Sequence, residues 1–100
     1  MIIKDGVVLA GLSLHMRPVL IIADHVWRLF DQELVITAGL DGTHSPGSLH
    51  YYGQALDFRT RYFTNPELVA TELRRQLKAH DSRYQVIVHS THIHVEYDNV

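Results

Sequence analysis

Residues 84–97, YQVIVHSTHIHVEY, are the part of the sequence that most clearly defines the fold. Two runs rich in apolar and β-branched residues, Tyr84 to Val88 and His92 to Tyr97, flank the pair Ser90-Thr91. Runs of this kind on either side of a short connection are typical of an antiparallel hairpin. The end of the chain is therefore predicted to form two paired strands.

Two helices are predicted upstream of this hairpin. Apolar residues recur at helical spacing after Pro18, which suits a first helical turn, and they predict a helix from about residue 17 to 32. Asn65 and Pro66 form a helix-start signal, a capping residue followed by a first-turn proline. The apolar stripe that follows predicts a second helix, which ends near His80.

The remaining segments complete an α+β pattern. Residues 34–38 form a short apolar run, and residues 54–60 alternate in the way that strands do. The first nine residues predict a short strand or an extended arm, and the glycine-rich segment 39–53 predicts a long loop. The order of these elements predicts a single α+β domain over residues 1–100, with two helices and a mainly antiparallel sheet.

The composition excludes several classes of protein. The 100 residues carry a formal charge of −2 with no basic cluster, so the positive field typical of nucleic-acid or membrane-surface binding is missing. There is no cysteine, which excludes disulfide scaffolds, thiolate metal sites and cysteine nucleophiles. No run approaches the roughly 20 apolar residues of a membrane span. Residues 1–6 lack the features of a signal peptide, so we expect synthesis in the cytoplasm.

Histidine is frequent and clustered in this chain. Five of the eight histidines lie in the two segments 44–50 and 89–94. Histidine is the commonest metal ligand and the usual acid or base near neutral pH. A functional site is therefore expected where these two segments meet.

Two groups of polar residues can converge if the long loop turns back onto the strand that follows it. His50 lies near the end of the loop and Asp57 in the strand, and a glycine between them permits a turn. Residues two apart on a strand share a face, so His92, His94 and Glu96 are predicted to point the same way. Two imidazoles and one carboxylate are a common ligand set for catalytic zinc, with a fourth position left for water.

This pattern of residues resembles that of the D-Ala-D-Ala metallopeptidase family. The motif Ser48-x-His50-x-x-Gly53-x-Ala55-x-Asp57-Phe58, followed by His92-x-His94, is similar to the family pattern nearly position for position. The family includes zinc D-Ala-D-Ala carboxypeptidases, phage endolysins that cleave L-Ala-D-Glu bonds, and the hedgehog signalling domain. The resemblance extends from about Val35 to Asp98 and implies a hedgehog-like or peptidase-like fold.

The resemblance implies a zinc-dependent peptidase of the bacterial cell wall. His50, Asp57 and His94 would bind Zn²⁺, and a metal-activated water would attack the scissile carbonyl of a peptidoglycan peptide. His92 is implied as the catalytic residue that handles the proton or stabilises the oxyanion. Glu96 is the alternative base, or a partner that orients a histidine. D-Ala-D-Ala carboxypeptidase and L-Ala-D-Glu endopeptidase activities both remain open.

One position departs from the family pattern. Relatives commonly carry an arginine just after the strand that precedes the zinc-binding loop, whereas this chain has Asp41 there. Arg59 or Arg61 would supply the missing charge, or His44 a hydrogen bond. The chain is also shorter than most catalytic domains of the family, so walls of the substrate site are either missing or supplied by a partner.

Two alternatives to an enzyme keep the metal without the catalysis. One is a zinc-containing module that binds peptides, as hedgehog proteins suggest. The other is a small structural domain, such as a virion component, in which His89 or Glu96 would complete the metal site. For the enzyme, a phage origin is expected, because the first residues lack the features of a signal peptide and something else must then carry the protein to the cell wall.

Overall fold

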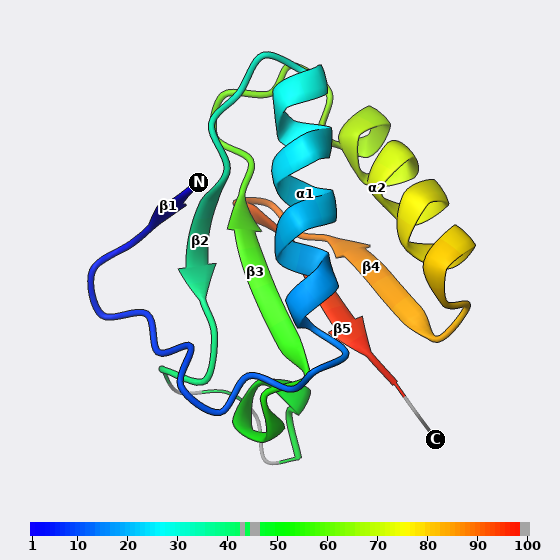
Figure 1. The fold of residues 1–100 in the computed structure, drawn as a ribbon. Coiled ribbons are helices and arrows are strands. Elements are labelled where there is room, and N and C mark those ends of the chain that lie inside the picture. Colours follow the sequence, from blue (N-terminus) through cyan, green and yellow to red (C-terminus); the bar gives the residue numbers. More distant parts are fainter. Residues whose placement is uncertain (43, 45–46, 99–100) are drawn as a thin grey trace.

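Five strands form one mixed sheet among residues 1–42, 44 and 47–98, which are the residues that the computed structural model of the chain describes (Figure 1). The sheet has the order β1-β2-β3-β5-β4. β1 is parallel to β2, and the other neighbouring pairs are antiparallel. The strands are β1 (Ile2–Ile3), β2 (Val35–Ala38), β3 (Ala55–Arg59), β4 (Tyr84–Val88) and β5 (His92–Tyr97). The predicted α+β class is confirmed.

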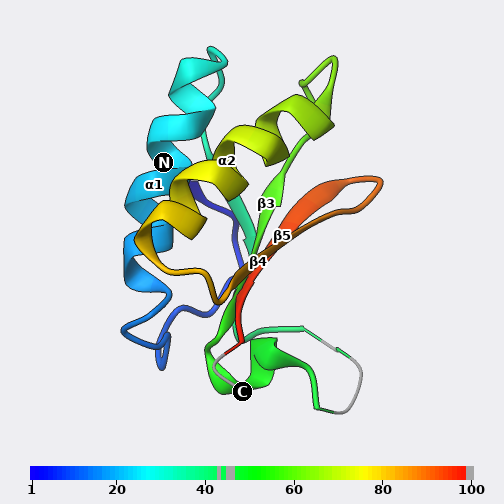
Figure 2. The ribbon, with the colours of Figure 1, turned by 90° about the vertical axis from the view of Figure 1, so that its right-hand side faces the viewer.

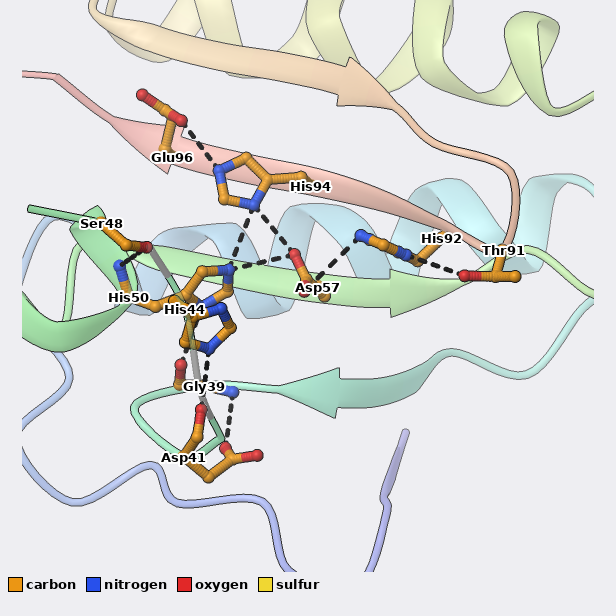
Figure 3. A network of polar contacts seen from close by, with 10 residues as sticks. All are labelled: Gly39, Asp41, His44, Ser48, His50, Asp57, Thr91, His92, His94 and Glu96. Carbon is orange, nitrogen blue, oxygen red and sulfur yellow. Dashed lines mark hydrogen bonds and ion pairs between the residues drawn. The ribbon is translucent and has the colours of Figure 1, made fainter. Parts of the chain in front are cut away.

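The α-helices of the described chain, α1 (Arg17–Leu29) and α2 (Pro66–His80), both cover the same face of the sheet (Figure 2). The hydrophobic core fills the layer between them and the strands. Its largest fully buried side chains include Trp27, Leu73, Leu77, Ile36, Phe58 and Ile93. Figure 2 shows no α-helix over the opposite face of the sheet in the described residues. Figure 3 shows polar side chains of β3 and β5 on this face. Among these residues, no helix has both the length and the apolar character that crossing a bilayer requires.

Both helices form close to where the sequence predicts them, with two differences in detail. Asn65 occupies the N-cap position of α2, but its side chain makes no capping hydrogen bond. Pro66 favours the helix start instead, because its fixed φ suits the first turn. Arg74 has a residue type that is typical of a solvated helix face, yet it donates a hydrogen bond of 2.9 Å to the carbonyl of Val86. This contact joins α2 to the adjacent strand β4.

The register of the sheet places polar residues of β3 and β5 side by side. Asp57 pairs with His94, and Arg59 pairs with His92. The predicted hairpin between β4 and β5 is present, and its turn is closed by a hydrogen bond of 2.9 Å from the amide of His89 to the carbonyl of His92.

Asp81, which follows α2, connects this helix to the sheet. Its carboxylate accepts hydrogen bonds from the guanidinium of Arg83 at 2.9 Å and from the hydroxyl of Tyr97 at 2.8 Å. These bonds, first of all the one from Arg83, hold the pKa of the Asp81 carboxyl well below its usual range. The carboxylate therefore stabilises the folded state while it is ionised.

Candidate metal centre

Three elements bring His50, Asp57 and His94 together on the open face of the sheet (Figure 3). His50 lies on a short 3-10 helix, η1 (Leu49–Tyr52), while Asp57 and His94 face each other on β3 and β5. Gly53 links η1 to β3 with a φ of +68°, and a Cβ at this position would lie 2.3 Å from the carbonyl oxygen of Gly11. Only glycine tolerates both the backbone angle and the close approach. The sequence-based expectation of a turn at this glycine is confirmed.

The metal-ligating atoms of these three side chains face one another. Nε2 of His50 is 3.3 Å from Oδ1 of Asp57, and Nδ1 of His94 is 2.9 Å from the same oxygen. The two ring nitrogens are 3.2 Å apart. Ligands held at about 2.0–2.1 Å from a tetrahedral ion are roughly 3.3 Å from one another, so this spacing suits metal ligands. The group could therefore bind a metal ion.

The outer nitrogen of each imidazole is already bonded to an acceptor. Nδ1 of His50 is 2.8 Å from the carbonyl oxygen of Gly39, and Nε2 of His94 is 2.8 Å from Oε1 of Glu96. A carbonyl or an ionised carboxylate can only accept, so these outer nitrogens carry the protons of the neutral rings. The inner nitrogens then direct lone pairs toward each other and toward Asp57. Three converging lone pairs require a cation between them, either a proton or a metal ion.

The electrostatics of the group agree with this requirement. Burial disfavours a charge on Asp57, but its close contacts with the rings of His50 and His94 outweigh this effect and hold the pKa of the carboxyl well below its usual range. Burial also disfavours the charged form of His94, yet its bonds to Asp57 and Glu96 raise the pKa of the imidazole overall. Without a metal ion, the proton of His94 would provide the positive charge. A metal ion would displace that proton on binding.

The three ligands are of two types that divalent transition metals prefer. Imidazole nitrogens bind zinc, copper, iron and nickel, and carboxylate oxygens are also common zinc ligands. No family model, curated protein or solved structure matches the chain. The ligands themselves therefore indicate which kind of ion the group could bind.

His92 and Glu96 lie on the same face of β5 as His94, as the alternation along the strand predicted. Nε2 of His92 is 3.7 Å from Oδ2 of Asp57, and its Nδ1 is 3.0 Å from the hydroxyl of Thr91. Burial lowers the pKa of His92, and Asp57 offsets this effect only in part. A neutral imidazole thus lies beside the group at neutral pH. Glu96 contacts the group through His94, so its carboxylate fixes the orientation of that ring.

Two more histidines pack around the group. The ring of His44 stacks on His50, with centroids 4.1 Å apart and planes 6° from parallel. The ring of His89 lies 4.8 Å from that of His92. From the sequence, His44 is expected as an alternative source of a hydrogen bond in place of the missing arginine, and His89 as a ligand that completes a structural metal site; both roles stay predictions. The sequence did not indicate that the carbonyl of Gly39 is the partner of His50. Every residue has a main-chain carbonyl, so residue type cannot identify such a contact.

Asp41, which follows β2 and the bend at Gly39, has a structural role. Its Oδ1 accepts hydrogen bonds from the amides of Val8 at 2.9 Å and Gly39 at 2.8 Å. Burial disfavours its charge, but these bonds lower the pKa of the carboxyl overall. Asp41 therefore holds the segment whose Gly39 carbonyl contacts His50. His50, Asp57 and His94 together are called the metal group below. Arg59 and Arg61 line a neighbouring cleft, and His92 is also one of its lining residues.

Proposed function

We propose that the protein is a zinc-dependent hydrolase that cleaves peptide bonds in peptidoglycan stem peptides. His50, Asp57 and His94 would hold the zinc ion. The observation that carries the proposal is the convergence of three lone pairs, with both outer ring nitrogens bonded to acceptors. The choice of peptidoglycan rests on the resemblance of the His50, Asp57 and His94 pattern to the D-Ala-D-Ala metallopeptidases.

Zinc suits this group better than a metal that needs six ligands. Two imidazoles and one carboxylate provide three protein ligands, and the remaining position of a tetrahedral site is then available for water. Glu96 is not free to occupy this position, because its Oε1 is 2.8 Å from the outer nitrogen of His94. The arrangement therefore favours a catalytic site over a closed structural one.

Each residue of the group would have a distinct part in hydrolysis. When bound, zinc supplies a water with a pKa of about 7 and polarises the scissile carbonyl. His92, neutral and 3.7 Å from Asp57, is the side chain best placed to accept a proton from the water or donate one to the leaving amine. Glu96 and the Gly39 carbonyl would keep the two ligating imidazoles in the correct tautomer.

The first experiment is elemental analysis of the purified protein beside His50→Ala and Asp57→Ala variants. We expect about one zinc per chain in the wild type, and a strong loss in both variants. His25→Ala, which removes an imidazole from the exposed face of α1, is the matched control and should keep its zinc. A wild-type protein that binds no zinc after exposure to it would refute the proposal.

Activity is tested with zinc-loaded protein on purified sacculi and on synthetic stem peptides. Release of D-alanine would identify a carboxypeptidase, and a new amino terminus on D-glutamate would identify an endopeptidase. His92→Ala should keep its zinc and lose most of the turnover. A zinc-loaded wild type that releases nothing would count against the enzyme.

A second candidate is a zinc-containing module that binds peptides or serves as a virion component. The observation that favours it is Asp41, which makes backbone hydrogen bonds where related enzymes carry an arginine. His92→Ala separates an enzyme from a peptide-binding module, because an enzyme loses turnover while it keeps its zinc, whereas a binding module loses little peptide affinity. The absorption spectrum of the cobalt-substituted protein separates catalysis from a structural role. A closed site of four protein ligands would support the structural role, whereas an exchangeable water would support catalysis.

A further inference from the structure

A cleft with three cationic side chains adjoins the metal group. It has a volume of about 330 Å³ and is lined by Lys4, Arg59 and Arg61, together with Thr37, Thr91 and His92. Lys4 continues the extended segment of β1, because its amide donates to the carbonyl of Ile36 at 3.0 Å. Residues far apart in the sequence thus place their positive charges around one opening.

These three cations have no acidic partner in the described part of the chain, where no salt bridge includes them. By contrast, Arg28, Arg75 and Arg83 each pair with a carboxylate in the same residues. The protein as a whole carries a formal charge of −2, so the concentration of positive charge is local. A cleft of this kind favours an anionic ligand.

The cleft lies at one end of the metal group. His92 lines it, and Nε2 of this residue is 3.7 Å from Oδ2 of Asp57. Arg59 is paired with His92 across β3 and β5. A second cleft, lined by Ile87, His89, His94 and Glu96 among others, lies at the other side of His94 and has no lysine or arginine. A ligand that spans the metal group would therefore meet cations at one end only.

The two peptide bonds left open by the proposed function share a chemical feature that matches this asymmetry. In D-Ala-D-Ala the residue on the amine side carries the terminal carboxylate on its α-carbon. In L-Ala-D-Glu the amine-side residue also has a free α-carboxylate, because the stem peptide continues through its side chain. In both cases a carboxylate lies one carbon away from the scissile nitrogen.

We propose that Lys4, Arg59 and Arg61 bind the free α-carboxylate of the residue on the amine side of the cleaved bond. This inference rests on the proposed function. It adds the direction in which the substrate peptide would lie across the metal group. The amine side lies toward His92 and the acyl side toward the cleft lined by Ile87 and Glu96. Charge-assisted hydrogen bonds from lysine and arginine are well suited to such a carboxylate.

The test measures binding, so it does not depend on turnover. Acetyl-D-Ala-D-Ala and acetyl-L-Ala-D-Gln, which have a free α-carboxylate, are titrated into the full zinc-free chain and followed by amide chemical shifts in NMR spectra. Their counterparts are acetyl-D-Ala-D-Ala amide and acetyl-L-Ala-D-isoglutamine, in which the α-carboxylate is amidated. We expect at least one α-carboxylate probe to bind about 10-fold more tightly than its counterpart, as charged hydrogen bonds predict. The tighter of the two α-carboxylate probes identifies the preferred bond.

Variants assign the effect to the cleft. Arg59→Gln and Lys4→Gln should each lower the affinity for the α-carboxylate probe by about 10-fold. The affinity for the amidated probe should not change. Arg28→Gln, which removes a paired cation elsewhere, should change neither. Equal binding of the paired probes, no binding of any probe, or variants that bind like the wild type would overturn the inference. Discriminating binding together with no hydrolysis by the zinc-loaded protein would refute the proposed function and leave only the carboxylate-binding role of the cleft. Hydrolysis without discrimination between the paired probes would support the proposed function and refute the inference.

Discussion

Removal of the Glu96 carboxylate tests whether this side chain orients His94 for the metal. Oε1 of Glu96 is 2.8 Å from Nε2 of His94, and this bond keeps the ring proton on the outer nitrogen. Nδ1, which is 2.9 Å from Asp57, then has its lone pair available. Glu96→Gln keeps an oxygen acceptor but loses the charge, whereas Glu96→Ala also frees the ring to change tautomer.

The size of the effect follows from the role of such a partner. Loss of a group that orients a ligating histidine typically weakens metal affinity by about 10–100-fold. We expect the glutamine variant near the lower end and the alanine variant near the upper end. A tenfold change equals about 1.4 kcal/mol, and at saturating zinc the same amount is lost from the metal-induced stabilisation. For a domain of this size that corresponds to roughly 5–10 °C in the zinc-dependent melting temperature.

The assay is a competition titration of zinc against a chromophoric chelator, with thermal melts at matched zinc concentrations. Glu67→Gln is the control, because it removes an exposed carboxylate in the first turn of α2. Its zinc affinity should equal that of the wild type. If Glu96→Ala binds zinc within twofold of the wild type, the carboxylate does not orient His94 and the assigned tautomer is wrong.

Three further predictions concern the scaffold that holds the site. Leu73→Ala should destabilise the fold by about 2–5 kcal/mol in urea denaturation, because this side chain is fully buried, while Leu68→Ala on the exposed side of the same helix should cost far less. Gly53→Ala should cost more than Gly6→Ala and also weaken zinc binding, since both have positive φ but only Gly53 would place a Cβ against a backbone carbonyl; equal losses of stability would contradict this. Asp81 stabilises the fold above its unfolded pKa, and this contribution is lost as the pH falls through its lowered folded pKa. Asp81→Asn should therefore reduce stability at pH 7 but much less at acid pH, and a pH-independent loss in acid-denaturation curves would argue against this account.

Much of the fold could be predicted because its signals are local. The hairpin of β4 and β5 follows from two short runs around one turn, and α1 and α2 follow from apolar stripes with prolines at their starts. The details that the sequence does not indicate are side-chain contacts between elements. Arg74 has the residue type of a solvated helix face, and only the proximity of β4 makes its hydrogen bond to Val86 possible.

The sequence by itself determined which residue types were available to the site and which faces they share. His92, His94 and Glu96 had to lie on one side of a strand, because side chains alternate along it. Only the tertiary structure decided that the Gly39 carbonyl holds the ring of His50, that Nδ1 of His94 rather than Nε2 faces Asp57, and that Lys4 joins Arg59 at one cleft. These features depend on contacts between segments far apart in the chain, and the spacing of residues along a sequence does not encode which atoms of distant segments come together.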